Sequence, residues 1–205
     1  MAATDGRIAT FPAMSLHFAP RLALLVTLLA LGACSRRSAS ARSTPDVTPL
    51  RTLPADSVFI LEVGGTPPAD TVVRLAPGER RAIVLRHGPP DQAAFAVVEF
   101  GDSAFTGGDS VEVTLRPRPG VFGLDIGSSS AFREGTVTFK YARHFAAPLA
   151  ARQRYGSDEQ FERRLAVGRL PGDGRIILLP TRRPASDNVS AALDGPGAYV
   201  VAGPR

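Results

Sequence analysis

Hydrophobic and polar residues alternate with a period of two along most of the chain from Ser57 onward. In the segment 110–115 (SVEVTL), the two valines and the leucine fall on one side of an extended chain, and the glutamate and the threonine fall on the other. This pattern is typical of a strand in an antiparallel sheet that has one buried face. Similar runs rich in Val, Ile, Phe and Thr predict strands over 57–63, 71–75, 81–87, 94–100, 110–116, 122–126, 136–141, 188–193 and 198–202.

Two further patterns complete the predicted fold. Segments 165–170 and 175–180 flank the turn sequence PGDG and predict a β-hairpin. Helix is expected only within 148–164, where Ser157 and Gln160 have the spacing of a capping box. About ten short strands separated by Gly, Pro, Asp and Ser predict an all-β fold, an antiparallel β-sandwich.

The N-terminal segment has a different pattern, a continuous apolar run from Leu22 to Ala33 preceded by Arg21. These twelve residues are too few for a helix that crosses a bilayer, which needs about 20 residues. A basic residue followed by a short apolar core and small residues is typical of a secretory signal peptide. We therefore expect residues 1–33 to be a signal peptide, with Met14 as a second candidate for the true start.

The residues at the end of this apolar run carry a family resemblance. The segment LGAC, residues 31–34, resembles the lipobox of bacterial lipoproteins and contains the only cysteine of the chain. In that family the thiol receives a diacylglycerol, the chain is cleaved before the cysteine, and the new amino group is acylated. The resemblance implies cleavage between Ala33 and Cys34 and lipidation of Cys34. Membrane lipid is then the first expected partner, because two or more acyl chains hold a protein stably on a membrane.

The segment after the cysteine is polar and has no periodicity. Residues 34–54 are rich in Ser, Thr, Pro and Arg, which predicts a flexible tether that links the lipid to a domain over 55–205. Residues 35–54 hold four arginines and one aspartate, whereas residues 55–205 hold eighteen basic and seventeen acidic residues. The basic excess therefore lies mostly beside the membrane, where it attracts anionic headgroups. The overall charge of the domain predicts no nucleic-acid partner.

Composition and motifs argue against several classes of protein. The chain of 205 residues is 44% hydrophobic and 21% charged, which excludes a fully disordered chain and a multi-span membrane protein. Lys140 is the only lysine, GSSSA at 127–131 lacks the last glycine of a nucleophile elbow, and neither His87 nor His144 lies in an HExxH motif. With Cys34 assigned to the anchor, the sequence predicts no enzyme, and a hydrolase with an unfamiliar site is the least favoured alternative.

Candidate binding residues depend on how the chain folds. A zinc site would need His87 and His144 to converge with a carboxylate such as Asp91 or Asp125. A calcium site would need the loop carboxylates to converge, namely Asp102, Asp109 and Asp125. Because histidines at strand ends and aspartates in turns are ordinary, neither a metal nor a cofactor is expected.

Arginine pairs and aromatic residues are the remaining candidates. The pairs at 80–81, 163–164 and 182–183 would form an anion-binding surface only if folding brought them together. Otherwise they belong to a solvated rim. Five aromatic residues are expected to pack in the core or at its corners rather than to form a sugar-binding platform: Phe132, Phe139, Tyr141, Phe145 and Tyr199.

Three segments of the C-terminal half carry a second resemblance. They are 132–141 (FREGTVTFKY), the hairpin strand that ends in Leu-Leu-Pro at 178–180, and 187–191 together with 197–201. The stretch from about 109 to 203, half of the chain, resembles the β-sandwich domain of ankyrins and netrin receptors, the ZU-type family. It departs from that family in having no tryptophan in the hairpin and a longer segment at 144–159. The resemblance implies a binding or assembly module rather than an enzyme.

Together these observations predict an envelope lipoprotein, anchored through Cys34, that presents a β-sandwich for protein interaction or assembly. Ser35 stands where an aspartate often retains lipoproteins in the inner membrane, so the outer membrane is favoured. The main alternative is an envelope module that binds a glycan or a metal ion.

Overall fold

The computed structural model of the protein describes residues 50–106 and 109–205. Within these ranges thirteen strands form two antiparallel sheets, which confirms the predicted all-β sandwich. The strands of the larger sheet are β1 (Arg51–Pro54), β2 (Val58–Ile60), β3 (Thr71–Leu75), β6 (Val111–Pro117), β7 (Gly123–Ser128), β9 (Ala166–Leu170), β10 (Arg175–Leu178) and β13 (Gly197–Pro204). The strands of the smaller sheet are β4 (Arg81–Arg86), β5 (Ala94–Phe100), β8 (Gly135–Lys140), β11 (Thr181–Arg182) and β12 (Asn188–Leu193).

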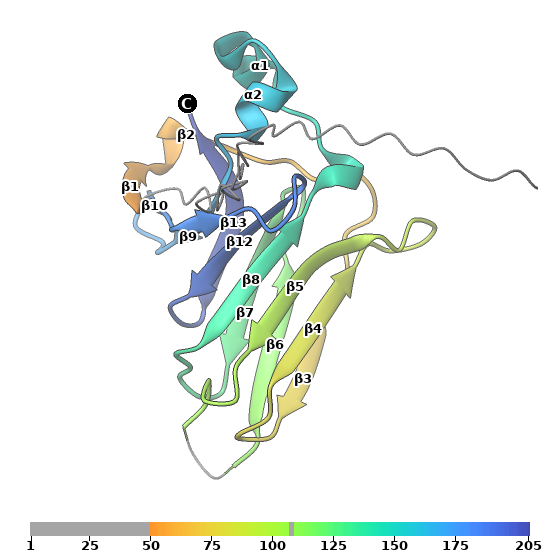
Figure 1. Cartoon of the computed structure of the whole chain (residues 1–205), viewed down its shortest axis with the longest axis vertical. Coiled ribbons are helices and arrows are strands. Elements are labelled where there is room, and N and C mark those ends of the chain that lie inside the picture. Colours follow the sequence, from red (N-terminus) through yellow and green to blue (C-terminus); the bar gives the residue numbers. More distant parts are fainter. Residues whose placement is uncertain (1–49, 107–108) are drawn as a thin grey trace, which may run out of the picture. The chain divides into compact units, whose positions relative to one another are not determined.

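The two sheets form the two layers of the sandwich. The larger sheet has the order β1-β10-β9-β13-β7-β6-β3, and β2 pairs with β13 beside this path. The smaller sheet has the order β11-β12-β8-β5-β4. In Figure 1 the strands β8, β5 and β4 lie in front of β7, β6 and β3. The predicted hairpin over 165–180 is present as the antiparallel pair β9 and β10.

Strand β1 is an addition to the predicted elements. It lies in the last four residues of the segment predicted as a tether, and it pairs with β10 from Arg51 opposite Leu178 to Pro54 opposite Arg175. This pairing covers the backbone groups of β10, which would otherwise form an exposed sheet edge. The folded part of the chain therefore extends back at least to Arg51.

The inner faces of the two sheets supply the core. Strand β6 buries Val111, Val113 and Leu115 and exposes Glu112, as the alternation of its sequence predicts. Aromatic rings join the two sheets: Phe95 of β5 stacks on Phe122, which precedes β7, at a centroid distance of 5.4 Å. Four of the five aromatic residues predicted for the core are buried: Phe132, Phe139, Tyr141 and Tyr199. The fifth, Phe145, is partly buried and packs against the core.

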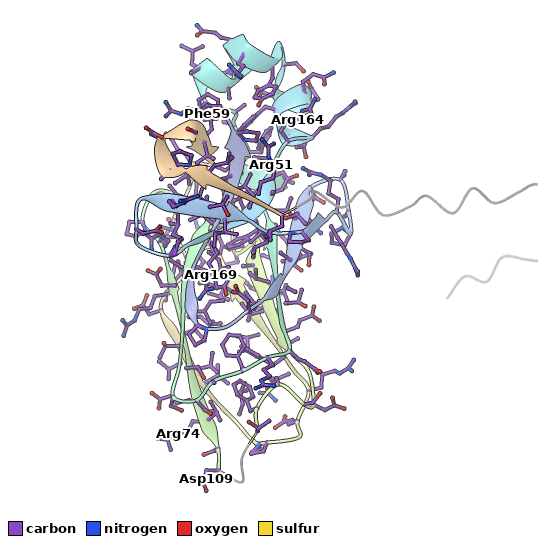
Figure 2. All side chains as sticks on the ribbon, turned by 90° about the vertical axis from the view of Figure 1, so that its left-hand side faces the viewer. Arg51, Phe59, Arg74, Asp109, Arg164 and Arg169 are labelled. Carbon is purple, nitrogen blue, oxygen red and sulfur yellow. The ribbon has the colours of Figure 1, made fainter. Side chains whose placement is uncertain are left out.

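Two short helices lie where the sequence predicts helix. They are α1 (Leu149–Tyr155) and α2 (Asp158–Glu162), and the Ser157 hydroxyl accepts a hydrogen bond from the Gln160 amide at 3.2 Å. The predicted cap is thus formed. Phe161 of α2 is buried with its ring edge-on to Phe59, and Figure 2 shows Phe59 and Arg164 at the end of the sandwich that carries the helices. Two 3-10 turns, Ala55–Ser57 and Ala142–His144, complete the described elements.

Candidate functional site

The outer face of the smaller sheet carries mostly small side chains and one carboxylate, Glu99. Strand register aligns its outward residues in two cross-strand rows, Ala82, Glu99, Thr136 and Ala192 in one and Val84, Val97, Thr138 and Ser190 in the other. All eight are exposed or half-buried, and none is aromatic. Within the second row the Thr138 hydroxyl donates to the Ser190 hydroxyl at 3.0 Å. We call this surface the small-sheet face.

Two neighbouring hollows lie on the small-sheet face. The first, of about 490 Å³, is lined by Arg80, Arg81, Arg133 and Glu134 together with residues of the first row. The second, of about 280 Å³, is lined by Arg182. Both include Thr136 and Ala192 in their linings. Folding therefore brings arginines from two of the three sequence pairs, 80–81 and 182–183, to one surface. The third pair, 163–164, follows α2 at the helical end (Figure 2).

The cations of the small-sheet face are largely free of acidic partners. Among the described residues, no carboxylate oxygen lies within 4.0 Å of a side-chain nitrogen of Arg80, Arg133 or Arg182. Arg81 does pair with Glu79 at 3.1 Å, and both side chains are about half exposed to solvent. An exposed pair of this kind contributes little free energy and is easily exchanged for another partner.

Several arginines of the larger sheet form ion pairs with acidic side chains. Arg74 of β3 lies 3.7 Å from Glu112 of β6, and Arg169 of β9 lies 2.8 Å from Asp194; both arginines are labelled in Figure 2. Two more pairs join the same sheet or its loops, Arg116 with Asp70 and Arg118 with Asp125. Four arginines of the larger sheet or its loops thus have acidic partners, whereas Arg51 of β1 and Arg175 of β10 have none among the described residues. The small-sheet face differs in gathering several such arginines on one surface, where their positive charge is available to an acidic partner.

The two histidines of the predicted mature chain converge at one end of β4. His87 follows β4 directly, His144 ends the 3-10 turn after β8, and their ring centroids are 4.5 Å apart. Asp91 accepts a hydrogen bond from His144 Nε2 at 2.6 Å and forms an ion pair with Arg143, whose Nε lies 3.2 Å away. The sequence names these residues as candidates, but only the fold places them together.

His87 is buried in a mainly apolar environment. It is 2% exposed and packs edge-on to Phe95 and Phe122. Its Nδ1 lies 3.1 Å from the Thr66 carbonyl oxygen, which can only accept, so Nδ1 carries the proton. Its Nε2 has no hydrogen-bond partner among the described residues. Burial lowers the pKa of His87, and the neighbouring His144 adds to this, while the Thr66 carbonyl and Asp91 oppose it.

The geometry of this cluster is not that of a metal site. Nitrogens that share one metal ion lie about 2 Å from it, which keeps the two imidazole rings further apart than packed rings. Here the rings of His87 and His144 touch, at an interplanar angle of 64°. Across residues 50–106 and 109–205, no three His, Cys, Asp or Glu side chains are grouped so as to hold a metal ion. Asp125 is elsewhere, paired with Arg118.

The three candidate calcium ligands, Asp102, Asp109 and Asp125, do not converge on one site. Asp109 lines a hollow of about 290 Å³ with Ser129 and Ser130, and Asp102 accepts from the neighbouring Ser103 hydroxyl. Figure 2 shows Asp109 at the opposite end of the sandwich from Arg164. The predicted cleavage and lipidation residues, Ala33 and Cys34, lie outside the described residues.

Comparisons with known proteins add no relative. No protein-family model, no curated protein sequence and no solved structure matches the chain. In the part of the chain that the structure describes, no helix combines the length and the apolar character needed to span a membrane. The fold and the surfaces described above define an all-β sandwich in which several arginines gather at the outer face of the smaller sheet. The lipobox and the ZU-type resemblance stay predictions from sequence.

Proposed function

We propose that the protein is an envelope lipoprotein, anchored by acylated Cys34, that uses the small-sheet face to bind an acidic surface of a partner protein. The observation that carries the proposal is the gathering of three arginines on one sheet face. Arg80, Arg133 and Arg182 border this face without a carboxylate partner among the described residues, while Arg74 and Arg169 of the larger sheet are paired. Charge complementarity of this kind speeds association and selects among partners.

A protein partner fits this face better than the alternatives. Sugar-binding faces generally rely on aromatic side chains, and the two cross-strand rows contain none. The near-neutral charge of residues 55–205 argues against nucleic acid. The ZU-type resemblance supports the same reading, since it implies a binding or assembly module. A tether of about twenty residues spans roughly 25 Å as a flexible coil, so the domain would work close to the bilayer.

The anchor is tested by removing the thiol. The Cys34→Ala chain is expected to be largely lost from the membrane fraction, because without acyl chains only the weaker attraction of the basic tether to anionic headgroups remains. Separation of membrane and soluble fractions, followed by an outer-membrane density gradient for the wild type, measures this. Ser35→Ala is the matched control and should stay membrane-bound. Unchanged membrane retention of Cys34→Ala would contradict the anchor.

The binding face is tested by reversing its charge. The triple variant Arg80→Glu, Arg133→Glu and Arg182→Glu is expected to reduce cross-linked capture of the partner in native membranes about tenfold or more, and raised salt should weaken wild-type capture. A variant with an equal charge change on the larger sheet, Arg74→Glu, Arg116→Glu and Arg169→Glu, is the control. Both variants must melt as folded proteins. Equal loss of capture in the two variants would mean that net charge, not this face, governs binding.

A further inference from the structure

Strand β4 forms a free edge of the smaller sheet, next to the hollow lined by Arg80, Arg81 and Arg133. It pairs with β5 over Arg81–Arg86 and has no pairing on its other side among the described residues. The opposite edge of the same sheet is β11, which is only two residues long. The edges of the larger sheet are β1, which ends in Pro54, and β3, whose Arg74 is already paired with Glu112. Strand β4 is therefore the longest edge of the smaller sheet.

The backbone of β4 presents hydrogen-bonding groups to solvent. Backbone groups of an antiparallel strand alternate in direction along the chain. The His87 amide donates to the Ala93 carbonyl, so it faces the β5 side. By alternation the amides and carbonyls of Ala82, Val84 and Arg86 face away from β5. An added strand would find three residues with unpaired backbone groups, in a segment that contains neither proline nor glycine.

The side chains of β4 have an apolar centre between two charged ends. Val84 is 47% exposed, and Arg81 and Arg86 close the strand on either side. Arg80 extends the positive charge at the first end. At the other end the Arg86 guanidinium donates to the Gln92 carbonyl oxygen at 3.2 Å and keeps its charge without a carboxylate partner among the described residues.

This charge pattern favours acidic residues in an added strand. Like charges directly opposite each other destabilise a strand pair, whereas opposite charges stabilise it. Carboxylates opposite Arg81 and Arg86 would therefore attract, and lysines or arginines there would repel.

Building on the proposed function, we propose that β4 accepts an extended segment of the partner protein as an additional antiparallel strand. The segment carries acidic residues five positions apart, opposite Arg81 and Arg86, with alternating β-forming residues between them. Backbone hydrogen bonds supply affinity in this mode of recognition, and side chains at the ends supply specificity. The added strand continues the small-sheet face, so the same partner can also reach the hollow lined by Arg80 and Arg133.

Labelled synthetic peptides test this inference on the full chain in detergent. The probe is Ser-Ser-Glu-Thr-Val-Thr-Val-Glu-Ser-Ser, and its control replaces both glutamates by lysine. Fluorescence anisotropy is expected to show about tenfold tighter binding of the acidic peptide, since two cross-strand pairs change from repulsive to attractive. The double variant Arg81→Glu and Arg86→Glu should reverse this preference. Equal binding of the two peptides, or an unchanged preference in the double variant, overturns the inference.

A backbone test separates strand addition from simple charge attraction. Val84→Pro removes one outward-facing amide and leaves the hydrogen bonds between β4 and β5 in place. It should weaken the binding of the acidic peptide at least fivefold. Hydrogen exchange on the unmodified chain gives the same information if this variant fails to fold: peptide binding should slow exchange of the Val84 and Arg86 amides. Undiminished binding to a folded Val84→Pro chain, or no protection of these amides, overturns strand addition. Partner capture that remains sensitive to Arg133→Glu and Arg182→Glu would then leave the proposed function standing.

Discussion

Replacing Phe95 by alanine is expected to lower the free energy of unfolding by about 3–5 kcal/mol. Phe95 is fully buried and stands between the two sheets, stacked on Phe122 at 5.4 Å and edge-on to Phe139 at 6.0 Å. Truncation removes apolar contacts from both partners and leaves a cavity that the paired strands cannot close. Because domains of this size have total stabilities of about 5–15 kcal/mol, a loss of this size is large.

Chemical denaturation of the folded domain within the full chain measures this loss. Val84→Ala is the matched control, since Val84 lies on neighbouring β4 but is 47% exposed, and a surface change of this kind costs about 0.5 kcal/mol or less. Similar destabilisation by the two variants would contradict a core centred on Phe95. A larger loss for Phe95→Ala places the inter-sheet aromatic contacts among the main contributions to stability.

The sequence was sufficient for the strands because their signal is local. Alternation along β6 identifies its buried side, and the spacing of Ser157 and Gln160 identifies the start of α2. Strand β1 was missed for a physical reason: RTLP has no alternation and ends in proline, and it becomes a strand only because β10 offers it an edge. The two-residue strand β11 is likewise formed by its pairing with β12, not by its own sequence.

The candidate surface depends on contacts that no local pattern encodes. Arg80 and Arg182 are about one hundred residues apart, and they reach one face because β4, which follows Arg80, and β11, which contains Arg182, belong to the same sheet. Whether an arginine is paired also depends on the register of strands, as for Arg74 opposite Glu112. The sequence identifies the three arginine pairs but does not show which of them reach the same surface. The same holds for His87 and His144, whose meeting depends on how the turns after β4 and β8 approach each other.

Acidification below pH 6.5 is expected to destabilise the sandwich through His87. The folded state holds this buried ring neutral, with its pKa below the ordinary value of 6.5, and the unfolded chain takes up a proton near that value. The unfolded state therefore binds more protons in this window, so the stability present above pH 6.5 is lost as the pH falls toward the folded-state pKa. A single group changes the free energy of unfolding by at most about 1.4 kcal/mol per pH unit.

The groups around His87 explain why the ring resists protonation. Phe95 and Phe122 desolvate it, and the charge interaction with His144 lowers its pKa further. Asp91 opposes this, but its carboxylate also contacts His144 and Arg143. Denaturation midpoints from pH 7.5 to 5.0 should therefore fall less steeply for His87→Gln, which keeps an amide donor for the Thr66 carbonyl but cannot titrate. Equal slopes for the two chains would assign the acid sensitivity to other groups. A reduced slope would assign the acid sensitivity to His87, which directly follows β4, the strand proposed to receive the partner.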